Sequence, residues 1–195
     1  MEALLESGEF RSAVALYETI YDVRPPSESE PYRQFLITAA ADLLQSGEAA
    51  AGVEFLEAYL DIFYRYPDAL VLLGRAYRTL GDYPASIDAF QHAYLYSHLA
   101  IMRSLIRDQL NWVVSLYSQR LRYEGRRQDI AEVYIGLMVV EPDNPYYAVG
   151  LAKAYVENAR YDDAVRALSQ VLHDAFVGKR ARRLLRTIQD RRGHS

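Results

Sequence analysis

Histidine and carboxylate side chains are the residues of this chain whose spacing could support metal-dependent chemistry. No histidine belongs to an HExxH pattern, in which two histidines on one helix face bind zinc. Asp88 and His92 stand four residues apart, so on a helix they would share a face and could hold a metal. Pairs of this kind are common on helix surfaces, and the sequence therefore predicts no metal site. The four histidines are His92, His98, His173 and His194.

Other patterns typical of catalytic sites are missing from the sequence. There are no cysteines, which excludes disulfides, thiolate catalysis and cysteine-based zinc sites. No glycine-rich phosphate loop follows a predicted strand, and the serines form no nucleophile-elbow pattern. We therefore expect a protein that is not an enzyme and that uses no cofactor.

The net charge of −4 is distributed unevenly over the 195 residues. Residues 179–195 contain seven basic residues and one acidic residue, a net charge of +6, so the preceding 178 residues carry −10. The basic tail could attract nucleic acid by neutralising phosphates. The acidic remainder would repel a duplex, however, and no base-reading module is present. Nucleic acid is therefore disfavoured as a partner.

The composition is that of a globular protein, with 51% hydrophobic and 25% charged residues. Met1-Glu2 opens an acidic amphipathic stretch instead of a signal-peptide pattern. No uncharged apolar run reaches the roughly 18 residues of a membrane span. The sequence predicts no membrane span and assigns no compartment.

A helix-ending residue recurs five times, with spacings of 39, 34, 44 and 34 residues. Five residues after each occurrence stands a position where two helices would have to come close. Periods in this range indicate stacked supersecondary units. The five landmark residues are Gly8, Gly47, Gly81, Gly125 and Ala159, and the five close-approach residues are Ala13, Gly52, Ser86, Ile130 and Ala164.

The hydrophobic spacing between landmarks is helical. Leu70, Leu73 and Tyr77 fall on one helix face before Gly81, a residue suited to a left-handed helix end. Pro84 then stands at the start of the next helix, where its missing N–H is tolerated. Each unit is thus predicted to be an antiparallel helix pair joined by a tight turn. The tyrosines predicted to fill the space between helices are Tyr17, Tyr59, Tyr77, Tyr134 and Tyr155.

These units resemble tetratricopeptide repeats, a helix–turn–helix family with a period of about 34 residues. The resemblance implies an all-α fold, a right-handed α-solenoid (superhelix) of tetratricopeptide-like helix pairs. The motifs that carry it best are Leu73-Gly74, Tyr77, Gly81-Asp82-Tyr83, Ser86, Phe90 and Ala93, and Leu151-Ala152, Tyr155, Tyr161-Asp162-Asp163-Ala164, Leu168 and Val171. The solenoid is expected over residues 1–178, with units at about 1–25, 33–66, 67–100, 111–144 and 145–178.

Two insertions interrupt the register. Residues 25–31 are predicted to form a turn-rich linker. Ten further residues between positions 94 and 111 predict either a long second helix in the third unit or an extra helical turn before the fourth. This insertion could be neutral, or its apolar residues could form a protruding surface for self-association. The residues of that surface would be Ile101, Met102, Leu105 and Ile106.

Residues 179–192 predict one amphipathic helix with Leu184, Leu185 and Ile188 on its apolar face, within a basic capping helix and tail over 179–195. A solenoid needs such a cap because its last helix pair otherwise exposes an apolar face. The first helix of unit one is mostly missing. We therefore expect that the chain is a piece of a longer protein, or that Met1 was added for expression.

In the resembled family, the first helix of each pair lines a concave groove that accepts an extended peptide or a partner helix. Transfer of that register predicts a cationic stripe set among aromatic side chains. The arginines could also pair with acids of neighbouring helices, such as Asp68 and Glu157, and both interpretations stay open. The predicted groove residues are Arg75, Arg78, Trp112, Gln119, Arg122, Tyr123, Tyr146 and Lys153.

The sequence therefore predicts a non-enzymatic scaffold or adaptor that binds an acidic or amphipathic segment of another protein. The groove positions contain no asparagine, which disfavours the terminal-carboxylate clamp of chaperone-binding members of the family. The alternatives are a homo-oligomeric assembly module and a regulatory or docking domain of a longer enzyme.

Overall fold

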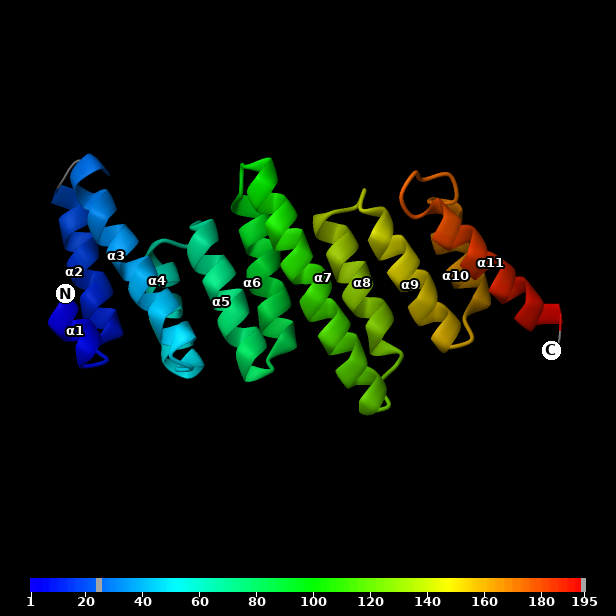
Figure 1. Ribbon diagram of the computed structural model, residues 1–195, viewed down its shortest axis with the longest axis horizontal. Helices are drawn as coiled ribbons and strands as arrows, with labels where there is room; N and C mark the ends of the chain where they lie inside the picture. Colours follow the sequence, from blue (N-terminus) through cyan, green and yellow to red (C-terminus); the bar gives the residue numbers. More distant parts are fainter. Residues whose placement is uncertain (24–25, 194–195) are drawn as a thin grey trace. The chain divides into compact units, whose positions relative to one another are not determined.

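The computed structural model describes residues 1–23 and 26–193, with the side chains of residues 1–22 and 30–192. These residues form helices and no strand, which confirms the predicted all-α fold (Figure 1). The helices are α1 (Glu2–Glu6), α2 (Phe10–Val23), α3 (Pro26–Gln45), α4 (Ala49–Ile62), α5 (Pro67–Leu80), α6 (Tyr83–Tyr96), α7 (Ala100–Tyr123), α8 (Asp129–Val140), α9 (Pro145–Glu157), α10 (Tyr161–Ser169) and α11 (Gly178–Gly193).

The chain divides into two compact units, Met1–Val114 and Ser115–Ser195. The boundary falls within α7, so the first part of this helix belongs to unit 1 and its last part to unit 2. In unit 1, α5 packs against both α4 and α6, and in unit 2, α9 packs against both α8 and α10. Each unit is thus a stack of helices in which neighbours along the chain are also neighbours in space, as expected for an α-solenoid.

All five landmark residues have a left-handed backbone. Four are glycines with φ between 76° and 88°, and the fifth, Ala159, has φ of 56°. At Gly81, the N–H donates to the carbonyl of Arg78 (3.1 Å), and the N–H of Asp82 donates to the carbonyl of Tyr77 (2.9 Å). The same two hydrogen bonds form at the other four landmarks. This Schellman pattern satisfies the last carbonyls of each first helix and reverses the chain, which confirms the predicted turns.

The predicted close-approach residues are all buried, and Ala13, Ser86, Ile130 and Ala164 are 0% exposed. Between α5 and α6, the Ser86 hydroxyl donates to the carbonyl oxygen of Gly74 at 2.7 Å. A Cβ atom on Gly74 would lie 2.9 Å from the ring of Phe90. The two helices of this pair therefore cross where both have small side chains.

Aromatic rings fill the core of unit 1. Tyr17 and Tyr59 are each 1% exposed and both pack against Phe63, with ring centroids at 5.2 and 5.0 Å. These two tyrosines are core residues, as predicted. Tyr77, Tyr134 and Tyr155 are half-buried, and Tyr134 and Tyr155 pack against the apolar cluster around Leu121, as predicted for residues that fill the space between helices. The hydroxyl of Tyr77 reaches the surface carboxylate of Glu57, to which it donates a hydrogen bond.

Neither insertion has the conformation that was predicted for it. Residues 26–31 are not a linker but the start of α3, and Pro31 lies inside that helix; Pro25 lies outside the described residues, as does His194. The ten extra residues neither lengthen α6 nor form a bridging turn. Helix α6 ends at Tyr96 because Ser97 is extended (ψ 128°), and α7 then begins at Ala100 and runs for 24 residues. The insertion thus extends the first helix of the fourth repeat at its N-terminal end.

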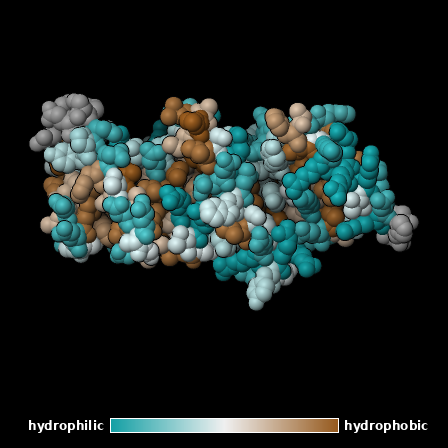
Figure 2. Space-filling view, viewed as in Figure 1, coloured by the Kyte–Doolittle hydropathy of each residue, from teal (hydrophilic) through white to brown (hydrophobic). Residues whose placement is uncertain are grey.

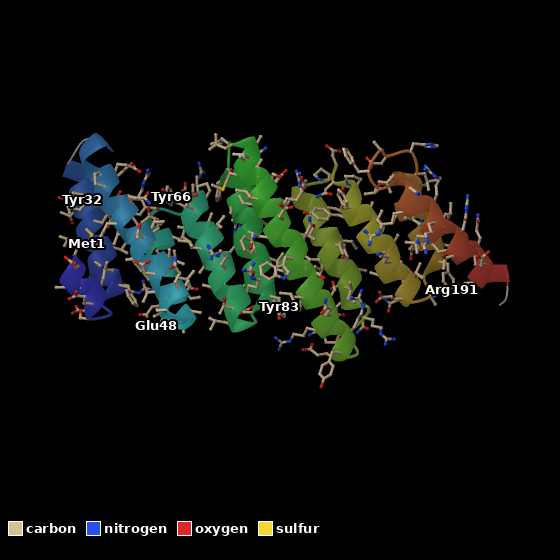
Figure 3. The ribbon with its side chains drawn as sticks, in the orientation of Figure 1. Met1, Tyr32, Glu48, Tyr66, Tyr83 and Arg191 are labelled. Atoms are coloured by element: carbon tan, nitrogen blue, oxygen red, sulfur yellow. The ribbon has the colours of Figure 1, made fainter. Side chains whose placement is uncertain are left out.

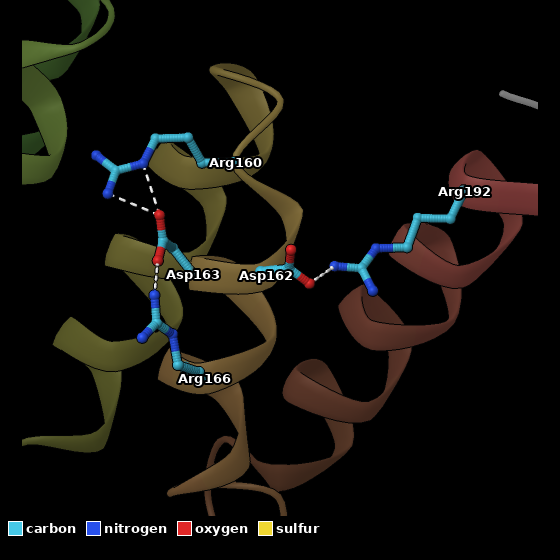
Figure 4. A network of polar contacts seen from close by, with 5 residues as sticks. All are labelled: Arg160, Asp162, Asp163, Arg166 and Arg192. Carbon is cyan, nitrogen blue, oxygen red and sulfur yellow. Dashed lines mark hydrogen bonds and ion pairs between the residues drawn. The ribbon is translucent and has the colours of Figure 1, made fainter.

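The predicted C-terminal amphipathic helix is α11, which packs against α9 and α10. Its residues Ala181 and Ile188 are 0% exposed and contact the apolar cluster around Leu168. An ion pair also joins the polar sides of α10 and α11 (Figure 4). Arg192 of α11 pairs with Asp162 of α10. Next to it, Asp163 of α10 pairs with Arg166 of the same helix and with Arg160, whose Nη2 lies 2.6 Å from Asp163 Oδ2.

Neither a membrane crossing nor a metal cluster is found in the described part of the chain. None of its helices combines the length and the apolar character that a bilayer span needs. No three histidine or carboxylate side chains gather there at metal-binding distance. Asp88 and His92 lie on one helix face as expected, with Oδ2 and Nδ1 3.4 Å apart.

The left-handed alanine gives a first prediction. A non-glycine residue in this conformation is strained by about 1–2 kcal/mol, so Ala159→Gly should raise the free energy of unfolding by about 1 kcal/mol. Gly81→Ala, at the equivalent turn, should lower it by about the same amount. Urea unfolding followed by circular dichroism measures both. A loss of stability in Ala159→Gly would contradict the assignment of the turn.

Two glycines of unit 2 give a second prediction. A Cβ on Gly150 would lie 2.2 Å from the ring of Tyr134, whereas nothing lies within 4 Å of one on Gly136. Overpacking costs about 1–3 kcal/mol, against a gain of about 1 kcal/mol in helix propensity. Gly150→Ala should therefore destabilise the protein by up to about 2 kcal/mol, and Gly136→Ala should stabilise it by about 1 kcal/mol. Thermal melts of the two variants should move in opposite directions.

Candidate functional site

A pocket with a volume of about 370 Å³ lies between α5 and the first part of α7, entirely within unit 1. Both helices are the first of their pairs, which is where the family resemblance places a binding surface. We call this site the α5–α7 pocket. Its lining residues are Val71, Arg75 and Arg78 from α5, and Met102, Leu105, Ile106, Gln109 and Trp112 from α7.

Arg78 and Trp112 form the polar wall of the α5–α7 pocket. The guanidinium carbon of Arg78 lies 3.9 Å from the centroid of the Trp112 ring, a cation–π contact. Nη1 of Arg78 donates to Oε1 of Gln109 at 2.6 Å. Trp112 is still 52% exposed. The ring is therefore held in place by Arg78 while its remaining surface is available for contact.

Arg75 brings a second positive charge to the same wall. Its side chain is exposed and makes no hydrogen bond or ion pair with the residues that the structure describes. Burial, and then the positive charge of Arg75, lower the pKa of Arg78 from its usual value. The two guanidinium groups thus repel each other, and an anion placed beside them would relieve that repulsion.

Apolar side chains of α7 complete the lining of the pocket and continue onto the surface. Leu105 is 56% exposed, Ile101 is 74% exposed, and Leu99 is 65% exposed. Figure 2 shows a brown, hydrophobic cluster at the top of the molecule over the connection between α6 and α7. Apolar surface therefore adjoins the two arginines, which suits a ligand with both an acidic and an apolar side chain.

The four residues predicted for self-association do not share one environment. Ile101 and Leu105 are exposed, and Met102 is half-buried in the wall of the α5–α7 pocket. Ile106 is only 1% exposed, so the prediction that it belongs to a protruding surface is wrong. It lies one helical turn beyond Met102 at the floor of the pocket, where it belongs to the core of unit 1.

The predicted groove residues of unit 2 are arranged differently. Arg122 donates from Nε and Nη2 to the two carboxylate oxygens of Glu157, both at 2.9 Å. Of the two interpretations that the sequence left open, the structure therefore shows for Arg122 the ion pair with an acid of a neighbouring helix. In contrast, no ion pair joins Asp68 to Arg75 or Arg78 among the described side chains.

Lys153 lies near two further cations of unit 2. It is half-buried, and its pKa is lowered by that burial and then by the positive charges of Arg180 and Arg122. Arg180, on α11, was not predicted as a site residue because the sequence places it in a separate capping helix. The other predicted groove residues of this unit are exposed: Gln119, Tyr123 (93%) and Tyr146 (48%).

Gln109 and Met102 were likewise missed as lining residues of the pocket. The register that predicts the groove covers only the equivalent of a normal repeat, whereas the N-terminal extension of α7 supplies these two side chains. A signal did exist, because Gln109 precedes Trp112 by three residues and so shares its helix face.

A family model described as tetratricopeptide repeat matches residues 37–98. These residues include α4, α5 and α6, with two left-handed turns and the Ser86–Gly74 crossing. Residues 37–98 thus resemble tetratricopeptide repeats in sequence. The match covers the third repeat, whose first helix supplies one wall of the α5–α7 pocket.

Solved structures with similar folds cover most of the chain at low identity. MamA is 17% identical over 92% of this chain and 90% of its own, with a TM-score of 0.44. A thermophilic TPR protein of Thermus thermophilus is 16% identical over 80% of this chain and 98% of its own, with a TM-score of 0.32. The TPR2AB domain of yeast Sti1, in complex with pHSP90, is 14% identical over 96% and 80%, with a TM-score of 0.35. No curated protein sequence matches the chain.

Trp112 allows the α5–α7 pocket to be observed directly, because it is the only tryptophan of the protein. Arg78→Ala removes the cation that covers its ring and admits water, so the fluorescence emission of Trp112 should shift to longer wavelength. Arg75→Ala is the matched control, since among the described residues the cation over the ring is Arg78 and the removal of Arg75 should leave the emission maximum in place. Identical spectra for Arg78→Ala and the parent protein would contradict the stacked geometry.

Proposed function

We propose that this protein is a non-enzymatic scaffold or adaptor that binds an acidic or amphipathic segment of a partner protein. Tetratricopeptide repeats generally mediate binding between proteins, and the sequence offers no catalytic constellation. The segment would lie along the first helices of the repeats, and its principal anchor would be the α5–α7 pocket.

The pairing state of the pocket arginines supports this proposal. Arg75 and Arg78 lie together without an acidic partner among the described residues, beside the half-exposed ring of Trp112. A hydrogen bond from arginine to a carboxylate contributes roughly 1.5–3 kcal/mol. Burial of an apolar side chain against Leu105 and Trp112 adds to this. An aspartate or glutamate next to a leucine, methionine or phenylalanine therefore fits the pocket best.

The predicted groove residues of unit 2 would offer an acidic segment a second contact surface: Gln119, Arg122, Tyr123, Tyr146 and Lys153. Among them, Arg122 must release Glu157 before it can bind a partner carboxylate, so the loss of one ion pair offsets the gain of the other. Lys153 forms no ion pair with a carboxylate among the described residues, and a partner anion beside it would also reduce the repulsion between Lys153 and Arg180. We therefore expect Arg122 to contribute less to affinity than Arg75.

Selection from a phage-displayed library of random short peptides tests the proposal. The selected peptides should share an acidic residue adjacent to a large apolar residue, and their binding should change the fluorescence of Trp112. Arg75→Glu should weaken binding by at least roughly 10- to 100-fold, because it removes one charge-assisted hydrogen bond and adds repulsion between two carboxylates. Arg122→Glu should weaken it by less than Arg75→Glu does.

Arg127→Glu is the matched control, because this exposed arginine lies outside the predicted groove and forms no ion pair within the described part of the chain. Its affinity for the selected peptides should equal that of the parent protein. Peptides without an acidic residue, or peptides whose affinity is the same for Arg75→Glu and the parent, would rule out the pocket as the binding site.

A further inference from the structure

A second pocket, of about 340 Å³, lies in unit 1 among α1, α2, α3 and α4. Its floor includes Leu5 and the stacked rings of Phe10 and Phe55, whose centroids are 5.2 Å apart. An apolar cavity of about 150 Å³ already holds a benzene ring. The pocket therefore has room for a phenylalanine side chain.

Carboxylates surround this floor. Helix α1 supplies Glu6, α3 supplies Asp42, and the turn before α4 supplies Glu48, which is labelled in Figure 3. None of the three forms an ion pair within the described residues, and all are exposed. Residues 1–61 hold twelve acidic and three basic residues, a net charge of −9. This acidic pocket therefore favours an aromatic side chain carried on a strongly basic segment.

Unit 2 displays an aromatic side chain of that kind. Phe176, in the connection between α10 and α11, is 80% exposed. Oδ1 of Asp174 accepts hydrogen bonds from the N–H groups of Phe176 and Val177, both at 2.8 Å, and Val177 is 1% exposed. The backbone of the connection is thus anchored by the two hydrogen bonds and by the buried Val177, and the Phe176 ring lies in solvent. Pre-organised display of this sort lowers the entropic cost of binding.

Basic side chains follow Phe176 directly. Lys179, Arg180 and Arg183 lie on the first turns of α11, are exposed, and form no ion pair with described residues. Residues 179–192 hold seven basic residues and one acidic residue. An exposed ring followed by three available cations matches, in number and sign, the apolar floor and three carboxylates of the acidic pocket.

We propose that the acidic pocket of one copy of this chain binds Phe176 of a second copy. Lys179, Arg180 and Arg183 of the second copy then face Glu6, Asp42 and Glu48 of the first. The contact joins two different surfaces, so each added copy presents a new acidic pocket or a new Phe176, and association continues unless the copies close into a ring. The α5–α7 pocket shares no residue with this contact, and the inference is independent of the proposed function.

Sedimentation velocity over a concentration series at low salt tests the contact. The parent protein should self-associate reversibly, and added salt should weaken the association because the contact is ionic at its rim. Phe176→Ala should weaken it by about 30-fold, as for an interface hot spot. Tyr123→Ala is the matched control, since it removes another highly exposed ring (93%) and should leave association unchanged.

Charge reversal gives the decisive comparison. A variant with Glu6→Lys, Asp42→Lys and Glu48→Lys should be monomeric, and so should a variant with Lys179→Glu, Arg180→Glu and Arg183→Glu. An equimolar mixture should associate again, because each reversed surface finds its complement. A parent protein that remains monomeric throughout the series, association that survives Phe176→Ala, or a mixture of two folded variants that stays monomeric would each overturn the proposal. Circular dichroism establishes that the variants are folded.

Discussion

Each helix pair depends on a chain reversal within two to five residues, and a left-handed landmark residue makes that reversal possible. At Gly81, two backbone hydrogen bonds end α5, and α6 starts at Tyr83. In this pair, so short a turn brings the two helices together within five residues, where their small side chains let the Ser86 hydroxyl donate a 2.7 Å hydrogen bond to the carbonyl oxygen of Gly74. Ala159 keeps the same backbone despite its strain, which indicates that the packing of α9 on α10 determines the turn.

Short-range rules made the fold largely predictable from sequence. Helical periodicity, helix-ending residues and small residues at the crossings each act over a few positions, so the five turns and the capping helix α11 could be placed without coordinates. The start of α7 could not. Residues 94–111 contain neither glycine nor proline, so no residue type in this stretch indicates that α6 ends at Tyr96 and that α7 begins at Ala100. Residues 26–31 led to the opposite error: Pro26 occupies the first position of α3, where proline is tolerated, but Pro31 lies inside the helix, where its type alone predicts an interruption.

The candidate site was predictable only in part, because pairing between distant side chains is a tertiary property. Register placed Arg75, Arg78 and Arg122 on the first helices of their repeats, but it could not distinguish an arginine that stacks on Trp112 from one held by Glu157, 35 residues away. Nor could it separate Leu105, which is exposed, from Ile106, which is in the core, since both fit the apolar stripe of a long helix. Burial and pairing decide which of these residues remain available to a ligand.

Charge sign would give the two pockets of unit 1 different ligands. Both have apolar floors, and burial against such floors supplies affinity with little selectivity. The α5–α7 pocket adds Arg75 and Arg78, whereas the acidic pocket adds three carboxylates, so a segment suited to one meets like charges at the other. Like-charge contact at an interface costs several kcal/mol. The basic start of α11 would thus be directed away from the arginine pocket, and an acidic partner segment away from the surface proposed to join two copies. Recognition of a partner and self-association could then proceed on one unit without competing for the same residues.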